Sequence, residues 1–487
     1  MLQVYNTKTR QKETFKQIKQ DCVRVYSCGP TVYNYAHIWN LRTFVFEDMV
    51  IRSLKFLWYN LRTVMNITDV DDKTIRDSIK AGETLKAFTE KYTDEFKQDM
   101  KKLSMLDYDE LVPVTTLIPE MVRMIQTMLN RKNAYLADDG SVYFKVASFK
   151  NYGKLAHLDM KNMKSTGRVD NDEYDKENIA DFALWKVWSE EDGDNFWEET
   201  FTIEWKEVVL KWRPGWHIEC SACNMKTHGK QIDIHMWGVD LIFPHHQNEI
   251  AQTESCTGKE FSKYWLHSGH LMVDGKKMSK SLGNFYTLRD IEKKFSDIES
   301  GLLMRSIRLS FLGGKYSDSI DFSFAKLEAS INTIKRTDEM IKSIARAWET
   351  SPEKWVGRDF REYMQELIGV YIERLEDDFS IPDALAVFFE FQKFINTGIS
   401  EQAFSKEEIY SIVDMLRSMN EVFAFIDLDI LDAAPEEVPS DIAEKLEARN
   451  TAKADKDFEL ADALRDEITA GWYKIIDDRE GTRVEKI

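Results

Sequence analysis

The sequence predicts an α/β catalytic region built on a doubly wound, Rossmann-type parallel sheet, with an inserted α+β piece and an all-helical C-terminal region. Three observations predict the sheet: residues 22–28 alternate like a strand, 40–58 have a helical pattern, and 61–67 form a second strand-like run. Strand, helix, strand is typical of nucleotide-binding sheets, whose ligands lie beyond the carboxyl ends of the strands.

The next elements predict that this sheet is interrupted and then resumes. Residues 83–106 and 119–132 have helical patterns, and an Asp-Asp-Gly-Ser turn at 138–141 predicts a hairpin that opens a mixed insertion. Strand-like sequence returns at 232–234, and we expect a helix to begin at Pro244, because proline suits a first helical position.

The last third of the chain is predicted to be helical. Apolar residues recur at helical spacing after about residue 325. The stretch 432–441, rich in proline and acidic residues, is the best linker candidate. A charged helical hairpin follows at 442–468, and then a short tail.

Composition limits the class of protein. A chain of 487 residues is too long for one core, so we expect three or four domains. No apolar run reaches membrane-spanning length and the first residues lack a signal-peptide core, so we expect a cytoplasmic protein without membrane contact. Five cysteines, an odd number, predict reduced thiols, some of them metal-bound. A net charge of −18 argues against diffuse nucleic-acid binding but allows local basic surfaces.

A metal site is one interpretation of four residues. His245 and Glu249 lie four apart on a predicted helix and so share a face, with Cys28 or Cys220 available as a soft partner. Zinc accepts this combination of ligands. On spacing alone, an ordinary helix with a satisfied histidine remains the more common outcome. Cys220 and Cys223 have the spacing of half a zinc ribbon, but no second pair exists to complete one.

Two further segments could bind phosphate. The loop DGKKMSKSLGNF at 274–285 carries three lysines between glycines and could cover a polyphosphate. Its alternative is a solvated basic turn. Thr31 and His37 precede a predicted helix, whose N-terminus favours anions, although a single histidine there is more often structural.

Taken in order, CGPTVY, NITDVDDK, RPGWHIEC, VDLIFPHH and KMSKSLGNF resemble the cysteinyl-tRNA synthetases, a family of class I aminoacyl-tRNA synthetases. The resemblance runs from about residue 20 to the end and includes DDFSIPDALAV and AKADKDFELADALRDE. It implies that ATP activates L-cysteine to cysteinyl-adenylate, which is then transferred to the 3′ end of tRNA(Cys). It also implies one zinc ion per chain and Mg²⁺ with ATP. We expect a monomer.

The resemblance implies roles residue by residue. Zinc would be held by Cys28, Cys220, His245 and Glu249; cysteine by Gly29, Thr68, Trp216 and His235; and ATP by Lys280, His37, Asn40, Gly238 and Asp240, with Lys280, Lys277, His37 and Thr31 assisting the chemistry. Zinc ligation of a thiol would reject serine without editing. The helical region would read tRNA through clusters such as Lys335, Arg336, Lys342 and Arg346, for each of which a solvated helix face is the alternative.

The resemblance also suggests domain boundaries. We expect the first half of the catalytic domain at 1–132, an inserted connective piece at 133–212, the second half with the zinc site at 213–272, the KMSKS loop and stem-contact segment at 273–325, a helical bundle at 326–431 and an anticodon-side domain at 442–487.

Four tryptophans depart from the family pattern. Trp39 stands where the family has the glycine of its His-Ile-Gly signature, and Trp58, Trp212 and Trp237 also stand at family glycines. Smaller departures are Gln247 for glutamate and Cys223 for methionine. We expect Trp39 and Trp237 to crowd the adenine pocket, because glycine lets a ring approach the backbone.

Two alternatives stay open. The first is a catalytically impaired paralogue that binds tRNA or cysteine, suggested by Trp39 and Trp237. The second is a ligase that couples cysteine to an amino sugar, which would not need the helical C-terminal third.

Overall fold

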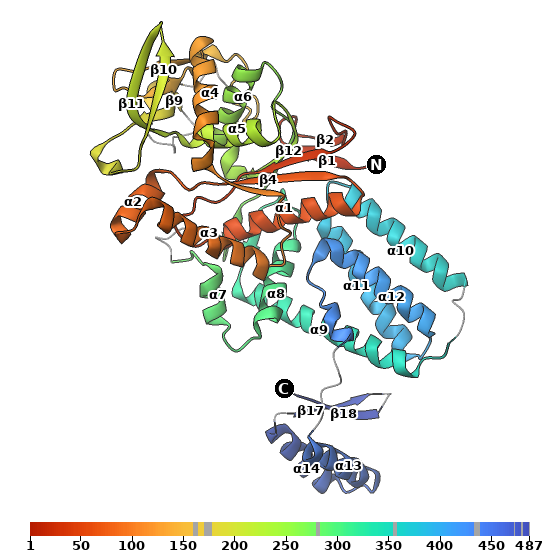
Figure 1. Cartoon of the computed structure of the whole chain (residues 1–487). Coiled ribbons are helices and arrows are strands. Elements are labelled where there is room, and N and C mark those ends of the chain that lie inside the picture. The colour runs from red at the N-terminus through yellow and green to blue at the C-terminus, as the bar shows by residue number, and fades with distance from the viewer. Residues whose placement is uncertain are drawn as a thin grey trace. The chain divides into compact units, whose positions relative to one another are not determined.

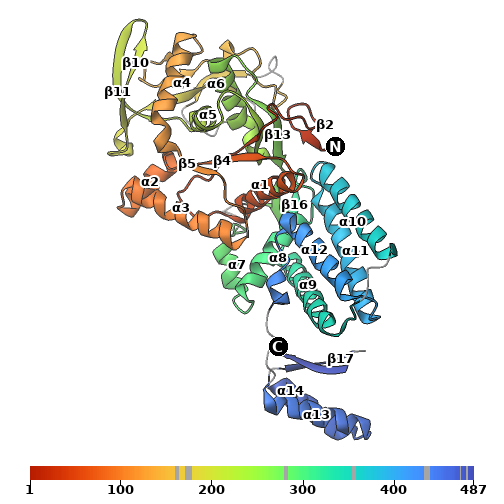
Figure 2. The same cartoon turned by 45° about the vertical axis from the view of Figure 1, so that its right-hand side comes forward.

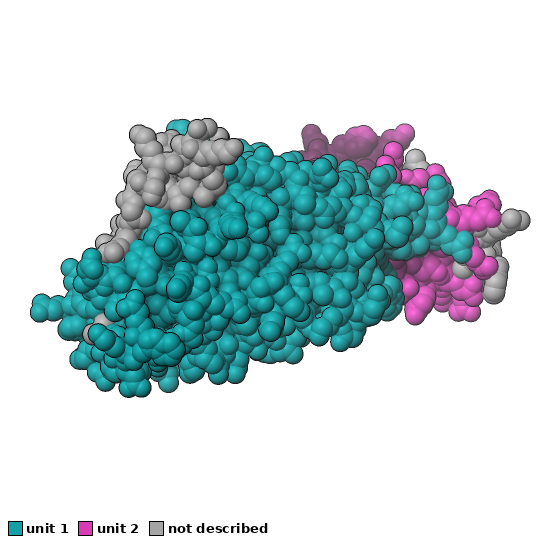
Figure 3. Space-filling view, turned by 90° about the horizontal axis from the view of Figure 1, so that it is seen from above, with its two compact units in different colours: residues 1–335, 364–388, 418–426 teal, residues 336–363, 389–417, 427–487 magenta. Residues whose placement is uncertain are grey.

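The computed structural model describes residues 1–487 except 159–163, 170–177, 279–282, 354–357, 433–438, 472, 479–480 and 487. The chain divides into two compact units, coloured separately in Figure 3. Unit 1 comprises Met1–Lys335, Met364–Phe388 and Ser418–Ile426, and unit 2 comprises Arg336–Tyr363, Phe389–Arg417 and Asp427–Ile487. Among the described residues, no helix combines the length and apolar character that crossing a membrane requires.

A five-stranded parallel sheet forms the centre of unit 1. Counted along the chain, the strands lie in the order 5-4-1-2-3, which is a doubly wound sheet with its switch point between the first and fourth strands. The predicted fold class is confirmed. In spatial order the strands are β13 (Ser262–Ser268), β12 (Ile232–Gly238), β3 (Val23–Ser27), β4 (Leu61–Ile67) and β5 (Glu110–Pro113).

Helices connect these strands and cover the sheet. The first, α1 (Ile38–Phe56), lies along β4 in Figure 1 and Figure 2, and most of its residues are buried. It begins where the Nδ1 atom of His37 accepts a hydrogen bond from the amide of Asn40. The other helices of this region are α2 (Asp72–Ala81), α3 (Leu85–Lys102), α4 (Ile118–Asn130), α5 (Trp216–Thr227) and α6 (Gln247–Thr257).

The expected helix start at Pro244 is confirmed in the backbone conformation, because the one non-helical residue of this segment is Phe243, although the regular hydrogen-bonding pattern of α6 begins three residues later. Ile242–His246 forms a short π-helical turn with Phe243 in an extended conformation (φ −140°, ψ 132°), and α6 begins at Gln247. The residue before a proline is sterically restricted to extended conformations, so the regular helix cannot run through Phe243.

The inserted α+β piece is confirmed between α4 and α5. It is a mainly antiparallel sheet in the order β10-β11-β9-β7-β6, with β8 paired to β9. Trp185 and Trp212 are fully buried in it, and Trp212 stacks on Phe201 with ring centroids 4.9 Å apart. The strands are β6 (Ala134–Leu136), β7 (Val142–Phe144), β8 (Lys164–Val169), β9 (Asn178–Val187), β10 (Trp197–Ile203) and β11 (Lys206–Pro214).

Smaller elements complete unit 1. An N-terminal hairpin and a three-stranded sheet that follows β13 were not anticipated, because their strands are only two to four residues long. These elements are β1 (Gln3–Asn6), β2 (Gln11–Thr14), β14 (Leu271–Val273), β15 (Lys276–Lys277) and β16 (Ile320–Phe322). Two helices, α7 (Leu288–Lys294) and α8 (Ser300–Leu312), lie between β15 and β16 in the chain.

The helical C-terminal region is confirmed. Its four long helices are followed by the expected charged hairpin of two helices, whereas the tail that we expected to be short forms a β-hairpin. Of the predicted linker 432–441, residues 433–438 lie outside the described part of the chain. The elements are α9 (Phe324–Thr350), α10 (Arg358–Glu376), α11 (Ile381–Ser400), α12 (Lys406–Phe423), α13 (Ser440–Ala454), α14 (Phe458–Ala470), β17 (Tyr473–Asp478) and β18 (Gly481–Lys486).

Candidate functional site

A cavity of about 310 Å³ lies beyond the carboxyl ends of β3, β4 and β12, at the switch point of the sheet. This is where a doubly wound sheet places its ligand. The loop between β3 and α1 forms one wall, and α5 contributes another. The predicted site residues that line the cavity are Cys28, Gly29, Thr31, His37, Asn40, Thr68, Trp216, Cys220, Asp240 and His245.

Of the remaining predicted residues, those in the described part of the chain do not line the cavity. His235 and Glu249 are fully buried on β12 and α6. Gly238 ends β12, and a Cβ added there would lie 2.4 Å from a carboxylate oxygen of Asp240, so only glycine leaves that oxygen its place. Lys277 is exposed on β15, and Lys280 lies outside the described residues.

Four buried donors converge at one end of the cavity. Cys28 follows β3, Cys220 is on α5, His245 is in the π-helical turn and Glu249 is on α6, yet their donor atoms all lie within 4.8 Å of one another. The Cys28 and Cys220 sulfurs are 3.8 Å apart, and His245 Nε2 lies 3.4 Å from the Cys220 sulfur and 3.3 Å from Glu249 Oε1. Two sulfurs, one imidazole nitrogen and one carboxylate oxygen form a donor set that suits zinc.

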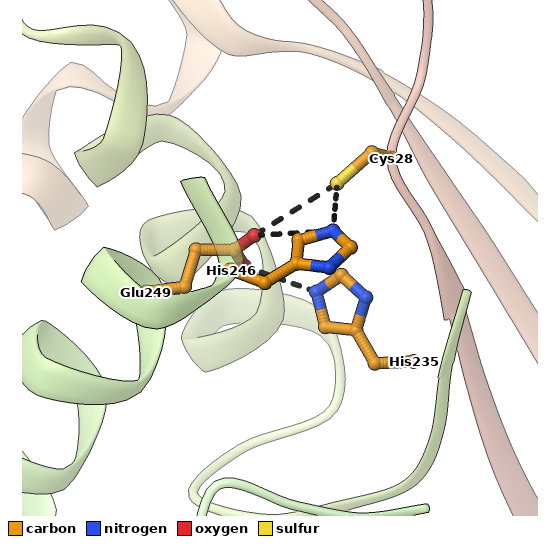
Figure 4. Close-up of side chains that lie close together, drawn as sticks. All are labelled: Cys28, His235, His246 and Glu249. Carbon is orange, nitrogen blue, oxygen red and sulfur yellow. Dashed lines mark hydrogen bonds and ion pairs between the residues drawn. The ribbon is translucent and has the colours of Figure 1, made fainter. Parts of the chain in front are cut away.

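A second group shares two of these donors and includes a residue that the sequence analysis missed. Figure 4 shows Cys28, His235, His246 and Glu249 directed toward one another. His246 Nε2 lies 3.5 Å from the Cys28 sulfur, and His235 Nε2 lies 3.0 Å from Glu249 Oε2. The adjacent histidines of the PHH sequence were a signal for His246, but sequence alone does not say that both point inward.

Burial disfavours the charged forms of the four residues drawn in Figure 4. It raises the pKa of the Cys28 thiol and of the Glu249 carboxyl well above their usual values. It also lowers the pKa of His235 and of His246 well below the usual value. Thiolate, carboxylate and neutral imidazole are the forms that ligate metals, so a bound cation would stabilise the ionised thiol and carboxylate against this desolvation.

His217 determines which nitrogen of His245 is available. The Nδ1 atoms of the two rings are 2.9 Å apart, so one of them donates to the other. This leaves Nε2 of His245 to face Cys220 and Glu249. His217 was not among the predicted site residues, although it directly follows Trp216 in the sequence.

Asn66 organises the floor of the cavity and was also missed. Its Oδ1 accepts hydrogen bonds from the Gly29 amide at 2.8 Å and the Tyr26 hydroxyl at 2.9 Å, and its Nδ2 donates to Thr68 Oγ1 at 3.0 Å. A Cβ at Gly29 would lie 1.5 Å from the Asn66 carbonyl oxygen, so this contact requires glycine. Asn66 begins the NITDVDDK segment, the signal that could have identified it.

The other end of the cavity is formed around His37. The Phe285 ring packs edge-to-face on His37 with centroids 4.7 Å apart, and the amide of Ile38 donates to the Tyr286 carbonyl at 2.9 Å. The segment after the KMSKS sequence therefore lies directly against the loop that begins α1. Lining residues here that the sequence analysis did not name are Asn34, Tyr35, Lys73 and Tyr92.

The tryptophans at family glycines lie in different surroundings. Trp237 lines the cavity and packs edge-to-face on Phe44 with centroids 5.1 Å apart. Trp39 is not among the lining residues in the described part of the chain, and its indole packs on His270 at 5.1 Å. Only Trp237 is thus placed where an indole reduces the volume of the cavity.

Trp58 lies far from the cavity and has the backbone conformation of a glycine. Its φ is 66° and its side chain is 94% exposed. Trp205, in the turn between β10 and β11, also has φ 66° and is 97% exposed, and the preceding Glu204 has φ 48°. Positive φ at both central residues of a two-residue hairpin turn favours Asn-Gly.

Comparisons with known proteins give a consistent result. A family model described as the tRNA synthetases class I (C) catalytic domain matches residues 14–332, and one described as the DALR domain matches residues 370–427. Cysteine--tRNA ligase of Chlamydia muridarum is 40% identical over 493 residues and covers 99% of both chains. Cysteine--tRNA ligase of Protochlamydia amoebophila is 39% identical over 489 residues, covering 100% of this chain and 98% of the relative.

Solved structures share the fold at low sequence identity. The Agrobacterium radiobacter K84 agnB2 LeuRS–tRNA–LeuAMS ternary complex matches with a TM-score of 0.61 at 10% identity, covering 87% of this chain and 86% of that one. Mycobacterium tuberculosis methionyl-tRNA synthetase in complex with methionyl-adenylate matches with a TM-score of 0.57 at 13% identity, covering 84% and 90%. These two matches establish similarity of fold.

Proposed function

Since the chain belongs to the cysteine--tRNA ligase family of class I tRNA synthetases, we propose that it activates L-cysteine with ATP and transfers it to tRNA(Cys) in this cavity. The observation that carries the proposal is one continuous cavity that has a buried sulfur, nitrogen and oxygen donor set at one end and the His37 loop at the other. Such a cavity can hold a thiol and a nucleotide side by side.

The donor set fits a zinc ion. We assign the ligands to Cys28, Cys220, His245 and Glu249, because all four are buried, their donor atoms are mutually close, and three of them line the cavity. Zinc there would supply a soft Lewis acid that prefers a thiolate to the harder, far less acidic hydroxyl of serine. His235, with its Nε2 at 3.0 Å from Glu249, would orient that carboxylate in addition to forming a wall.

The chain's own groups position the reactants for two displacements. In the first, a carboxylate oxygen of cysteine bonds to the α-phosphorus of ATP, the bond to the bridging oxygen breaks, and pyrophosphate leaves. In the second, the terminal ribose hydroxyl of tRNA attacks the acyl carbon and AMP leaves. No enzyme nucleophile is needed, so catalysis is orientation and charge stabilisation.

Of the residues assigned to ATP, those that the structure describes lie around the start of α1. His37 and Asn40 line the cavity, the Gly238 turn holds Asp240 beside them, and Thr31 follows β3. Lys277 and Lys280 would neutralise the polyphosphate, together with the Mg²⁺ that ATP brings. Gly29, Thr68 and Trp216 would contact cysteine. The hydrogen bonds that the Gly29 amide donates to Asn66 and that Asn66 donates to Thr68 support this assignment.

The alternatives have less support. An impaired paralogue would be free to lose its metal donors, but all four are present and converge in space. A ligase that couples cysteine to an amino sugar would not need the region that matches the DALR domain.

The candidate contacts to tRNA lie on α9. They are the exposed Lys335, Arg336 and Lys342 and the half-buried Arg346.

Three parts of the proposal rest on the family and on sequence pattern. They are a cytoplasmic location, a monomeric state and the domain boundaries given above. Light scattering on the purified chain tests the second.

Cysteine-dependent exchange of labelled pyrophosphate into ATP tests the function. We expect exchange with cysteine, none with serine, and loss of exchange with a zinc chelator. Cys220→Ser should lose both zinc and exchange. Cys256→Ser, which alters a cysteine outside the donor set, should keep both. Exchange that proceeds equally well with serine, or in chelated and zinc-free enzyme, would contradict the proposal.

A further inference from the structure

Arg289 lies where three elements that border the cavity meet. It is on α7, just after the Phe285 and Tyr286 segment that packs against the His37 loop. Its guanidinium carbon lies 3.9 Å from the centroid of the Tyr35 ring, a cation–π contact. Tyr35 belongs to the loop between β3 and α1 and lines the cavity.

Two carboxylates on α3 hold the same guanidinium. One Arg289 nitrogen donates to both Asp99 oxygens, at 3.1 and 3.0 Å, and a second pairs with Glu95. Asp99 is almost fully buried and Arg289 is only 26% exposed, so water screens these pairs less than it would on an open surface. A planar guanidinium can stack on a ring while it donates in its own plane, which an ammonium group cannot do.

Tyr35, on which Arg289 packs, in turn contacts a second residue of the cavity wall. Tyr35 packs edge-to-face on Tyr92 of α3 with centroids 5.5 Å apart, and Tyr92 also lines the cavity. Arg289 is not among the lining residues in the described part of the chain, so any effect on the cavity passes through Tyr35. The Tyr92 ring and the two carboxylates that hold Arg289 all belong to α3. Helix α3 therefore contacts both Arg289 and the Tyr35 ring on which Arg289 packs.

We propose that Arg289 is a positioning residue for the nucleotide end of the cavity, where it fixes the wall formed by Tyr35 and Tyr92. The proposal rests on the proposed function in one respect, the assignment of the end near His37 to ATP. It assigns Arg289 no contact with cysteine or with the metal donors. Its loss should therefore weaken ATP binding while cysteine recognition and zinc content stay unchanged.

The test compares Arg289→Ala with a matched control. Lys102 also pairs α3 with α7, through Glu292 at 2.5 Å, but does not line the cavity, so Lys102→Ala breaks an ion pair between the same two helices. We expect Arg289→Ala to raise KM for ATP about fivefold to tenfold, as expected for losing a partly desolvated cation–π contact. KM for cysteine and zinc content should stay within twofold in both variants, and Lys102→Ala should keep the wild-type KM for ATP.

A double-mutant cycle and a conservative variant separate positioning from general stability. Tyr35→Leu removes the ring, and its effect on KM for ATP should not add to that of Arg289→Ala. Arg289→Lys keeps the charge but not the planar stack, and should fall between the wild type and Arg289→Ala. Additive effects, an unchanged KM in Arg289→Ala, or the same rise in Lys102→Ala would overturn the proposal.

Equilibrium dialysis with ATP alone separates this proposal from the proposed function. If the wild type binds ATP but shows no cysteine-dependent exchange, the proposed function fails. The ATP dissociation constants of the same variants then decide the role of Arg289. Equal dissociation constants for wild type and Arg289→Ala would overturn that role. A dissociation constant that is about fivefold to tenfold larger in Arg289→Ala would support it.

Discussion

At the scale of the residue, Trp58 has a side chain that its backbone does not favour. It is the first residue beyond the C-cap of α1, its φ is 66°, and its amide donates to the Lys55 carbonyl. This is the left-handed position that glycine commonly occupies after a helix. The indole is 94% exposed, so its loss removes little packing.

We therefore predict that Trp58→Gly stabilises the protein by about 1 kcal/mol, the approximate cost of a Cβ in the left-handed region. Denaturant unfolding measures the change. Trp58→Ala is the control, because it removes the indole but keeps the Cβ and should bring no comparable gain. Equal stabilisation by alanine and glycine would show that backbone strain is not the cause.

Trp237 is the tryptophan whose position bears on the proposed ATP site. It lines the cavity, while Trp39 packs on His270. The Trp39→Gly/Trp237→Gly double variant is predicted to bind ATP more tightly than the wild type, because it restores space beside the backbone. We expect Trp237→Gly alone to give most of the gain and Trp39→Gly alone to give little. Unchanged ATP affinity in the double variant would contradict this.

His228 should make stability depend on pH. Burial lowers its pKa from 6.5 to about 4, and its Nε2 donates to the Val25 carbonyl at 3.2 Å. The unfolded chain binds the proton more readily than the folded one. The stability contributed by neutral His228 is thus present above pH 6.5 and is lost as the pH falls toward 4, by about 2 kcal/mol at pH 5.

Unfolding at pH 7 and pH 5 measures this difference. His228→Gln should lose less stability between the two pH values than the wild type. The exposed His157 is the control, and His157→Gln should keep the wild-type slope. The proposed metal donors are the same in the wild type and in both variants. Any pH-dependent change in stability that comes from their titration therefore cancels when the three proteins are compared. If His228→Gln and the wild type lose the same stability between pH 7 and pH 5, His228 is not the source of the pH dependence.

At the scale of the element, one buried carboxylate joins α1 to its neighbours. Asp48 on α1 pairs with Arg308 of α8 at 2.5 Å and with Arg52 at 2.8 Å, and it accepts the Leu106 amide at 2.7 Å. Arg308 is fully buried and also donates to the Leu103 and Phe423 carbonyls. Helix α1, which begins after His37, is thus fixed to α8 and to the end of α12.

Asp48→Asn should destabilise the protein by roughly 3 to 5 kcal/mol, because it leaves the buried Arg308 charge without its partner. The control is Glu110→Gln, which breaks the exposed pair with Arg62 and should cost less than about 1 kcal/mol. Denaturant unfolding of both variants gives the comparison. A loss of similar size in both would mean that the Asp48 network adds no more than a surface pair.

Elements with a strong sequence signal were predictable, and an element with a weak signal was not. The run at 61–67 has the length and β-branched content of a strand and is β4 without change. The helix start at Pro244 was also predictable, because proline restricts Phe243 to an extended conformation and the helical backbone begins directly after it. The terminal hairpin β17–β18 was missed because a two-stranded unit gives only a weak alternating pattern.

At the scale of the whole molecule, the four proposed metal donors come from positions 28 to 249 of the chain, and folding brings their donor atoms within 4.8 Å of one another. The resemblance to the family implied which four residues would meet. Spacing alone related only His245 to Glu249. Packing between elements that no sequence pattern relates brings His246 and His235 close to two of the same donors. The same kind of packing places Asn66 and Arg289 where they support the cavity walls.

We propose that a zinc ion at Cys28, Cys220, His245 and Glu249 recognises the substrate thiol. X-ray absorption at the zinc edge tests it most directly, because it counts the sulfur ligands at about 2.3 Å. We predict one zinc ion per chain with two sulfur ligands in the free protein, three after cysteine is added, and two after serine is added. A sulfur count that stays at two with cysteine, or a folded, active protein without zinc, would contradict the account.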